Sequence, residues 1–202
     1  MSYWRMNQMK DKRVVFFDRI RELEDTEYLT YYLKYQLAPV IMGYKPSITL
    51  SLGRRDGRRI SKIKTLKVIE SLGLRGMVLR ETTNTHIVLA YRKCSIEDIL
   101  QQPKEREFLE SLGYPLDSVY RTLSYLRKRY EYCHCPAELG TFLGFPIEDV
   151  KDYMCGTKKK CLLCGYWQVY NNRCEAEKIF KRYDDAKESM LSYLLEELLR
   201  SS

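Results

Sequence analysis

A chain of 202 residues, with 45% hydrophobic and 31% charged residues, can form one domain with a sizeable core. No apolar run approaches the roughly 18 residues of a transmembrane helix, and the first residues lack the apolar core of a secretory signal, so we expect a cytoplasmic protein that makes no membrane contact. In the cytoplasm, its seven cysteines are expected to be reduced thiols or metal ligands, not disulfides.

The first quarter of the chain predicts helix followed by strand. Residues 1–15 lack periodicity and are expected to be loose. Apolar residues recur at helical spacing over residues 16–35, with an interruption near residues 25–26 where a second helical segment could be capped. This helix should end by Pro39, because the residue before a proline avoids the helical region. Residues 48–52 alternate between apolar and polar side chains, as in a strand with one buried face.

A helix and a hairpin are predicted next. Residues 58–73 form the helix, which ends at Gly73. Its apolar residues repeat every three positions, at Ile60, Ile63, Leu66 and Ile69. Residues 76–93 contain two β-branched runs around residues 83–85, a pattern typical of a β-hairpin. His86 begins the second strand, where a lone histidine is more often structural than a ligand.

The second half is mostly helical in its pattern. Ser95 is expected to cap the first of its helices, with Asp98 completing a capping box. The other predicted elements are helices over residues 104–115, 119–132 and 175–200 and a strand over residues 163–170. Together the elements predict one α+β domain over residues 16–202, with a small, mostly antiparallel sheet, several packed helices and a long C-terminal helix.

A basic segment is the first candidate site. The net charge is +8, and basic residues outnumber acids seven to one between residues 51 and 67. These seven are Arg54, Arg55, Arg58, Arg59, Lys62, Lys64 and Lys67. Such a cluster attracts phosphates, and the 17 tyrosines of the chain could stack on bases. The simpler interpretation is that the tyrosines lie at the edge of the core.

The cysteines of residues 133–170 are the second candidate site. Cys133 and Cys135 form a Cys-x-Cys pair, and Cys161 and Cys164 form a Cys-x-x-Cys pair. Two such pairs could bind zinc or iron through four thiolates, with His134 or Cys155 as a substitute ligand. A redox dithiol and plain unliganded thiols are the alternatives. The redox dithiol is disfavoured, because residues 164–170 are predicted as a strand and the helix N-terminus that activates such a dithiol is missing.

Residues 136–154 resemble a helix-turn-helix, with two short helices joined by a turn at Gly144. In that interpretation the second helix would enter the major groove of DNA. It carries three acids and one base, which suits phosphates poorly. A packed helical hairpin is therefore the alternative.

From residue 34 to about residue 187 the chain resembles an uncharacterised bacterial family, number 3793 among the domains of unknown function. The resemblance rests on the stretches LAPVIMGYKPSITLSL, KEREFLESLGYP, PAELGTFLGFPIEDVKDYM and CLLCGYWQVYNNRCEAEKIFKRYDDAK. It implies a His-Cys pair at residues 36–37, where this chain has Gln-Leu, and a histidine at Ala137. The signature residues retained are Lys45, Glu138, Cys164, Gly165, Tyr166 and Trp167. No activity is implied.

These observations favour a non-enzymatic binding or regulatory protein that engages nucleic acid or a nucleoprotein through the basic segment. The first alternative is a thiol- or metal-dependent redox protein that uses the cysteine pairs. The second is a degenerate family member that binds a protein partner through its C-terminal helix.

Overall fold

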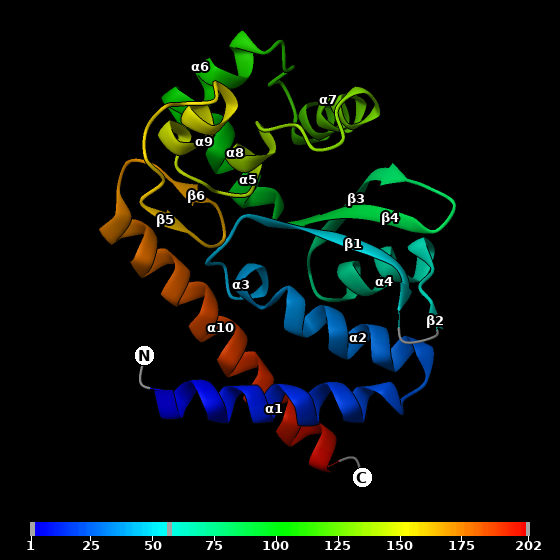
Figure 1. The fold of residues 1–202 in the computed structure, drawn as a ribbon. Coiled ribbons are helices and arrows are strands. Elements are labelled where there is room, and N and C mark those ends of the chain that lie inside the picture. Colours follow the sequence, from blue (N-terminus) through cyan, green and yellow to red (C-terminus); the bar gives the residue numbers. More distant parts are fainter. Residues whose placement is uncertain (1–2, 56–57, 201–202) are drawn as a thin grey trace.

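The computed structural model describes the backbone of residues 3–55 and 58–200 and the side chains of residues 12–53 and 58–200. A four-stranded sheet lies at the centre, with helices on both faces (Figure 1). The predicted α+β domain with a long C-terminal helix is confirmed. In chain order the elements are α1 (Tyr3–Arg21), α2 (Asp25–Gln36), α3 (Ala38–Ile41), β1 (Ser47–Arg55), β2 (Arg58–Arg59), α4 (Lys62–Ser71), β3 (Arg75–Glu81), β4 (Thr85–Tyr91), α5 (Lys93–Gln101), α6 (Pro103–Ser111), α7 (Val119–Tyr132), α8 (Leu139–Phe142), α9 (Ile147–Met154), β5 (Leu163–Cys164), β6 (Gln168–Val169) and α10 (Arg173–Arg200).

The sheet has the order β2-β1-β4-β3, and each neighbouring pair is antiparallel. The predicted strand after the first helices and the predicted hairpin are both confirmed, as β1 and as β3 with β4. Leu50 of β1 lies opposite Val88 of β4, and a register shift interrupts β3 between Val78 and Arg80. A small second hairpin, β5–β6, lies outside this sheet.

Two apolar cores lie on opposite faces of the sheet, because successive side chains of a strand point to opposite sides. In β4, Val88 and Ala90 join the core formed with α1, α2, α4 and α10. Leu89 and Tyr91 join the core formed with α5 to α9. Figure 1 shows these two groups of helices on either side of the strands.

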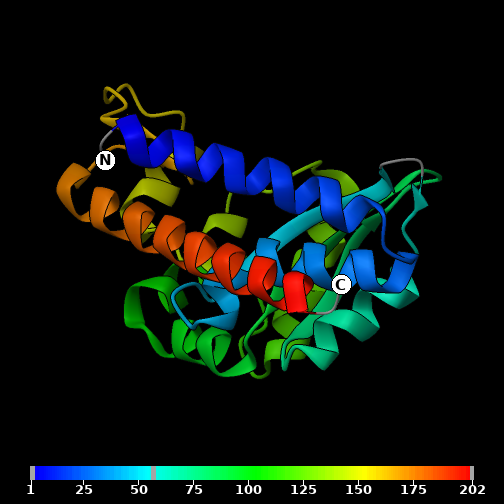
Figure 2. The same cartoon turned by 90° about the horizontal axis from the view of Figure 1, so that it is seen from below.

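Helices α1 and α10 close the first core from outside (Figure 2). Phe16 and Ile20 of α1 are fully buried, as is Leu194 of α10. Residues 3–15, part of the segment expected to be loose, belong to α1, and residues 1–2 lie outside the described backbone. Most of the apolar stripe of α10 packs inside this chain, whereas Leu199 is exposed. In the described part of the chain, no helix is long and apolar enough to cross a membrane.

Three local predictions are corrected. Ile63 is 61% exposed, because β2 pairs with β1 and delays α4 until Lys62; Thr65 and Val68 face the core instead. Ser95 caps nothing, because α5 already begins at Lys93. Residues 163–170 form the two strands of a hairpin and not one strand.

Candidate functional site

The β5–β6 hairpin is held in place by one buried acid of α9. Asp149 Oδ2 accepts a hydrogen bond from Trp167 Nε1 at 2.8 Å. Asp149 Oδ1 accepts from the backbone N–H of Tyr170 at 3.0 Å and from the backbone and side-chain N–H groups of Asn171 at 3.1 and 2.9 Å. The carboxylate therefore accepts four hydrogen bonds, one from the buried indole N–H and three from part-buried N–H groups; the buried donor would be costly to leave unpaired.

The same contacts change the interpretation of the helix pair. The first helix, α8, has four residues, and α9 turns Ile147, Asp149 and Val150 into the protein. The face of α9 that carries Asp149 is therefore occupied by contacts within the chain. The packed helical hairpin is thus the arrangement observed.

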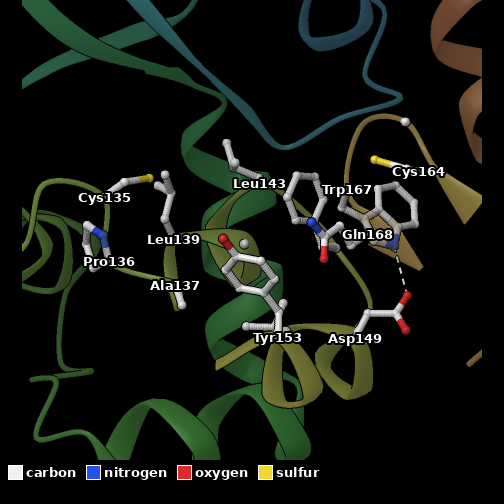
Figure 3. A pocket seen from close by; sticks show the side chains of 14 residues that line it. Cys135, Pro136, Ala137, Leu139, Leu143, Asp149, Tyr153, Cys164, Trp167 and Gln168 are labelled. Carbon is white, nitrogen blue, oxygen red and sulfur yellow. Dashed lines mark hydrogen bonds between the residues drawn. The ribbon is translucent and has the colours of Figure 1, made fainter. Parts of the chain in front are cut away.

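A mostly apolar pocket of about 310 Å³ lies between the α8–α9 region and the β5–β6 hairpin. Figure 3 shows the side chains around it, with the Tyr153 ring directed into the space and Cys135 and Cys164 at opposite ends. The Phe145 ring stacks on Trp167, with centroids 5.0 Å apart. Such a concave, aromatic-lined pocket with few polar groups is typical of small-molecule sites.

Lys45 lies behind the wall of this pocket and is buried among aromatic rings. Its Nζ is 5.2 Å from the ring centroid of Phe145, 5.5 Å from that of Tyr166 and 5.4 Å from that of Tyr183. Burial is the main cause that lowers the pKa of Lys45 to about 8, and the nearby charge of Lys187 lowers it further. An ammonium over aromatic faces is attracted by their quadrupoles, which offsets part of its lost hydration.

The sequence brings Lys45 and Phe145 together through a tight turn. Gly144 has φ +76°, and a Cβ at this glycine would lie 2.7 Å from Pro46 Cδ. Ser47 Oγ donates a hydrogen bond to the Phe142 carbonyl at 2.6 Å. The start of β1 is therefore docked against the α8–α9 connection, which places Phe145 beside the lysine.

Glu138 is buried on the other side of α8. Its Oε1 accepts hydrogen bonds from Tyr114 Oη at 3.0 Å and from Arg129 Nε at 2.7 Å. Burial and this carboxylate raise the pKa of Tyr114 well above its usual range. Glu138 is thus paired with Tyr114 and Arg129 inside the fold. The role of Glu138 in this structure is structural.

The four cysteines predicted as metal ligands are exposed free thiols, as are the other three cysteines. Within the described side chains, no group of three or more His, Cys, Asp or Glu residues is arranged to hold a metal ion. His134 instead contacts Arg80 through Nδ1. The structure therefore does not bring the Cys-x-Cys and Cys-x-x-Cys pairs together as a zinc or iron site.

The seven basic residues of the predicted nucleic-acid site fall into different environments. Arg58 is largely buried in contacts described below, and Lys62 is paired with Glu81 at 2.5 Å. Arg59, Lys64 and Lys67 are exposed. Arg54 and Arg55 lie in β1, but their side chains are outside the described residues, as are residues 56–57.

Arg58 ties the strands to the helices. Its guanidinium donates hydrogen bonds to the carbonyls of Arg21 and Leu23, pairs with Asp25 at 3.0 Å, and lies 4.9 Å from the ring centroid of Tyr28. These contacts fix the α1–α2 turn. Arg58 is thus a structural residue.

A polar groove of about 310 Å³ lies beside the exposed basic residues of this segment. Arg59, Lys62 and the first turn of α4 form one wall, and residues 82–85 of the β3–β4 turn form the other. His86 lies at its floor, buried and 3.4 Å from Thr65 Oγ1. Burial lowers the pKa of His86, consistent with the structural role expected of it.

Sequence reasoning missed Phe145, Asp149 and Tyr153. Asp149 was counted only as one of three acids on the second helix of the predicted pair. In the structure it lies between Ile147 and Val150 on the buried face of α9. The Gly-Phe-Pro at residues 144–146 was the available signal for Phe145, because a glycine before a helix-starting proline marks a tight turn.

These features define a single α+β domain with an aromatic-lined pocket beside a buried lysine. The chain belongs to the family described as a protein of unknown function, DUF3793, whose model matches residues 33–200. No curated protein matches the chain, and no solved structure matches it. The signature residues Gly165 and Trp167 line the pocket together with Ala137, and Tyr166 lies against Lys45.

Proposed function

We propose that this protein binds a small, mostly apolar, planar molecule in the pocket between α8, α9 and the β5–β6 hairpin. The observation that carries the proposal is the stacked pair of Phe145 and Trp167 in the wall of a 310 Å³ pocket. A flat ligand would contact these rings and the Tyr153 ring, and the Tyr153 hydroxyl and the Gln168 amide could orient one polar group of it.

The resemblance to the family adds support of a different kind. Ala137, Cys164, Gly165 and Trp167 all line the pocket, and each belongs to a signature position. Ala137 stands where the resemblance implies a histidine, so this chain offers an apolar methyl group at that point. This favours binding over acid–base chemistry in this chain.

The proposal is tested by ¹⁹F NMR with 4-fluorobenzyl alcohol as the probe. We expect its resonance to broaden or shift with the wild-type protein and to regain its free position with Ala137→Trp, because the indole fills the pocket. Glu107→Trp adds the same ring at an exposed site on α6 and should leave the probe signal as in wild type. No response with the wild type, or an equal response with Ala137→Trp, contradicts the proposal.

Binding of nucleic-acid phosphates is a second candidate function, favoured by the polar groove beside exposed Arg59, Lys64 and Lys67. The cations could neutralise phosphates along the groove rim, and the hydroxyl side chains of its far wall could donate to phosphate oxygens. Arg58 plays no part, because its guanidinium is occupied within the fold.

This second candidate is tested with a fluorescent single-stranded RNA of mixed sequence. Affinity should fall steeply with salt, with a log–log slope of about −0.7 for each phosphate neutralised. The variant Arg59→Glu/Lys64→Glu/Lys67→Glu should abolish binding. Lys128→Glu/Lys158→Glu/Lys160→Glu changes the net charge equally at other exposed positions and should bind nearly as wild type. Equal losses in both variants would show only a response to net charge.

A further inference from the structure

Lys45 is a buried amine without a counter-ion. Its side chain is 7% exposed, and among the described residues no hydrogen-bond acceptor or carboxylate pairs with its Nζ. The three rings of Phe145, Tyr166 and Tyr183 are its neighbours instead. Buried lysines are rare unless they are paired, so this arrangement calls for a reason beyond packing.

A second cation lies close by. Lys187 Nζ is 5.5 Å from the centroid of the same Tyr166 ring, and its charge disfavours the charged form of Lys45. Asp184 of α10 accepts a hydrogen bond from Tyr166 Oη at 2.8 Å. Desolvation by apolar surroundings together with a neighbouring cation is the combination that activates lysine as a nucleophile.

The amine is enclosed but keeps contact with solvent. The residue keeps 7% of its surface exposed. This exposure is small, so we expect only a small aldehyde to reach the nitrogen between the rings. The half-buried Phe145 stands between this nitrogen and the pocket that it lines.

We propose that Lys45 is a nucleophilic amine that condenses with small aldehydes. This goes beyond the proposed pocket function, because it concerns the amine behind the pocket wall and requires no ligand in the pocket. The free amine donates its lone pair to the carbonyl carbon, and an N–C bond forms. One proton moves from the nitrogen to the former carbonyl oxygen, which gives a carbinolamine. The carbinolamine then loses its hydroxyl group together with the second proton of the nitrogen as water, and a C=N bond remains. Amine and aldehyde thus give imine and water, with no oxidant or reductant.

The surroundings suit both states of the nitrogen. The protonated imine is a cation in the place of the ammonium, so the attraction to the three ring faces is retained. The fraction of reactive amine is also favourable: a pKa of about 8 leaves roughly a quarter of the Lys45 side chains neutral at pH 7.5, against roughly one in a thousand for an ordinary lysine.

The test is reductive trapping with limiting acetaldehyde and sodium cyanoborohydride at pH 7.5, followed by peptide mass spectrometry. We expect Lys45 to be ethylated at least about tenfold faster than Lys64, which is exposed, since the roughly 250-fold larger neutral fraction outweighs restricted access. In protein unfolded by guanidinium the two rates should become equal. Lys187→Met should slow Lys45 severalfold at this pH without changing Lys64, because it removes the neighbouring cation.

Two results would overturn the proposal. One is a Lys45 rate at or below that of Lys64 in the folded protein. The other is a preference for Lys45 that persists after unfolding, which would place its cause in the local sequence and not in the aromatic surroundings. Lys45→Arg, which cannot form the adduct, assigns the modified peptide.

Discussion

The indole N–H of Trp167 and the carboxylate of Asp149 are joined by a 2.8 Å hydrogen bond that connects the β5–β6 hairpin to α9. Because the same carboxylate also accepts three N–H groups from Tyr170 and Asn171, it organises the wall of the pocket.

Asp149→Ala should lower the free energy of unfolding by about 3 kcal/mol, because it leaves the buried indole N–H without an acceptor and removes the charged acceptor of three part-buried N–H groups. Urea denaturation followed by circular dichroism measures this. Asp185→Ala is the matched control, since Asp185 is about half exposed and pairs only with Lys181 on the surface of α10; it should cost less than about 0.5 kcal/mol. Equal effects of the two variants would contradict the role assigned to Asp149.

Neighbouring arginines of β2 should differ sharply. Arg58→Ala should destabilise the protein by about 2–3 kcal/mol, because the carbonyls of Arg21 and Leu23 and the carboxylate of Asp25 lose a charged donor. Arg59→Ala should change stability by less than about 0.5 kcal/mol, as is usual for an exposed position. The measurement is the melting temperature of each variant by thermal unfolding. Similar melting temperatures for the two variants would contradict the structural role of Arg58.

Lys45→Met should stabilise the protein at neutral pH, by about 1–2 kcal/mol, because it removes the desolvated charge and gives up only the cation–π attraction. The pKa of Lys45 is about 8 in the folded protein and about 10.5 when unfolded. The unfolded chain therefore binds more protons between these values, and wild-type stability gains from this group as the pH rises through that window. The advantage of the variant should accordingly shrink between about pH 8 and pH 10.

The difference between variant and wild type is the quantity to measure, because tyrosines act in the opposite direction. Burial raises the pKa of Tyr183 to about 12, so the unfolded chain loses that proton first and stability falls at high pH. Lys64→Met, at an exposed site, should show no pH-dependent difference. A Lys45→Met advantage that stays constant over the whole window would refute the assignment.

The thiols of the folded protein should be accessible. All seven cysteines are exposed and free, so titration with Ellman's reagent should count seven thiols without denaturant and no more after guanidinium is added. Thiols that react only after unfolding or after a chelator is added would instead support the metal site predicted from the sequence.

Local patterns predicted most of the elements but not the contacts between them. The period of two in β1 is a property of neighbouring residues. The pairing of β2 with β1 is not local, and it shortened α4 and exposed Ile63. Likewise α1 packs against α10, at the far end of the chain. The sequence before Phe16 has no periodic pattern from which this helix could be predicted.

The candidate site was predicted only in outline. Trp167 and Glu138 stood out through the family resemblance, and both are buried in specific hydrogen bonds. The basic cluster and the cysteines stood out through composition. Composition cannot distinguish Arg58, which is bonded to the α1–α2 turn, from Arg59, which is exposed to solvent. Separation in sequence hid the Lys45 surroundings, whose rings come from residues 145, 166 and 183.

The closure of the first core by α1 and α10 has a consequence for synthesis. A ribosome makes Phe16 and Ile20 long before Leu191 and Leu194, yet these side chains share one core. The core formed by α5 to α9 with β3 and β4 uses only the middle of the chain and can form while translation continues. The first core stays incomplete until α10 has left the exit tunnel, so the growing chain exposes the apolar side chains that α10 later covers, and chaperones would bind them.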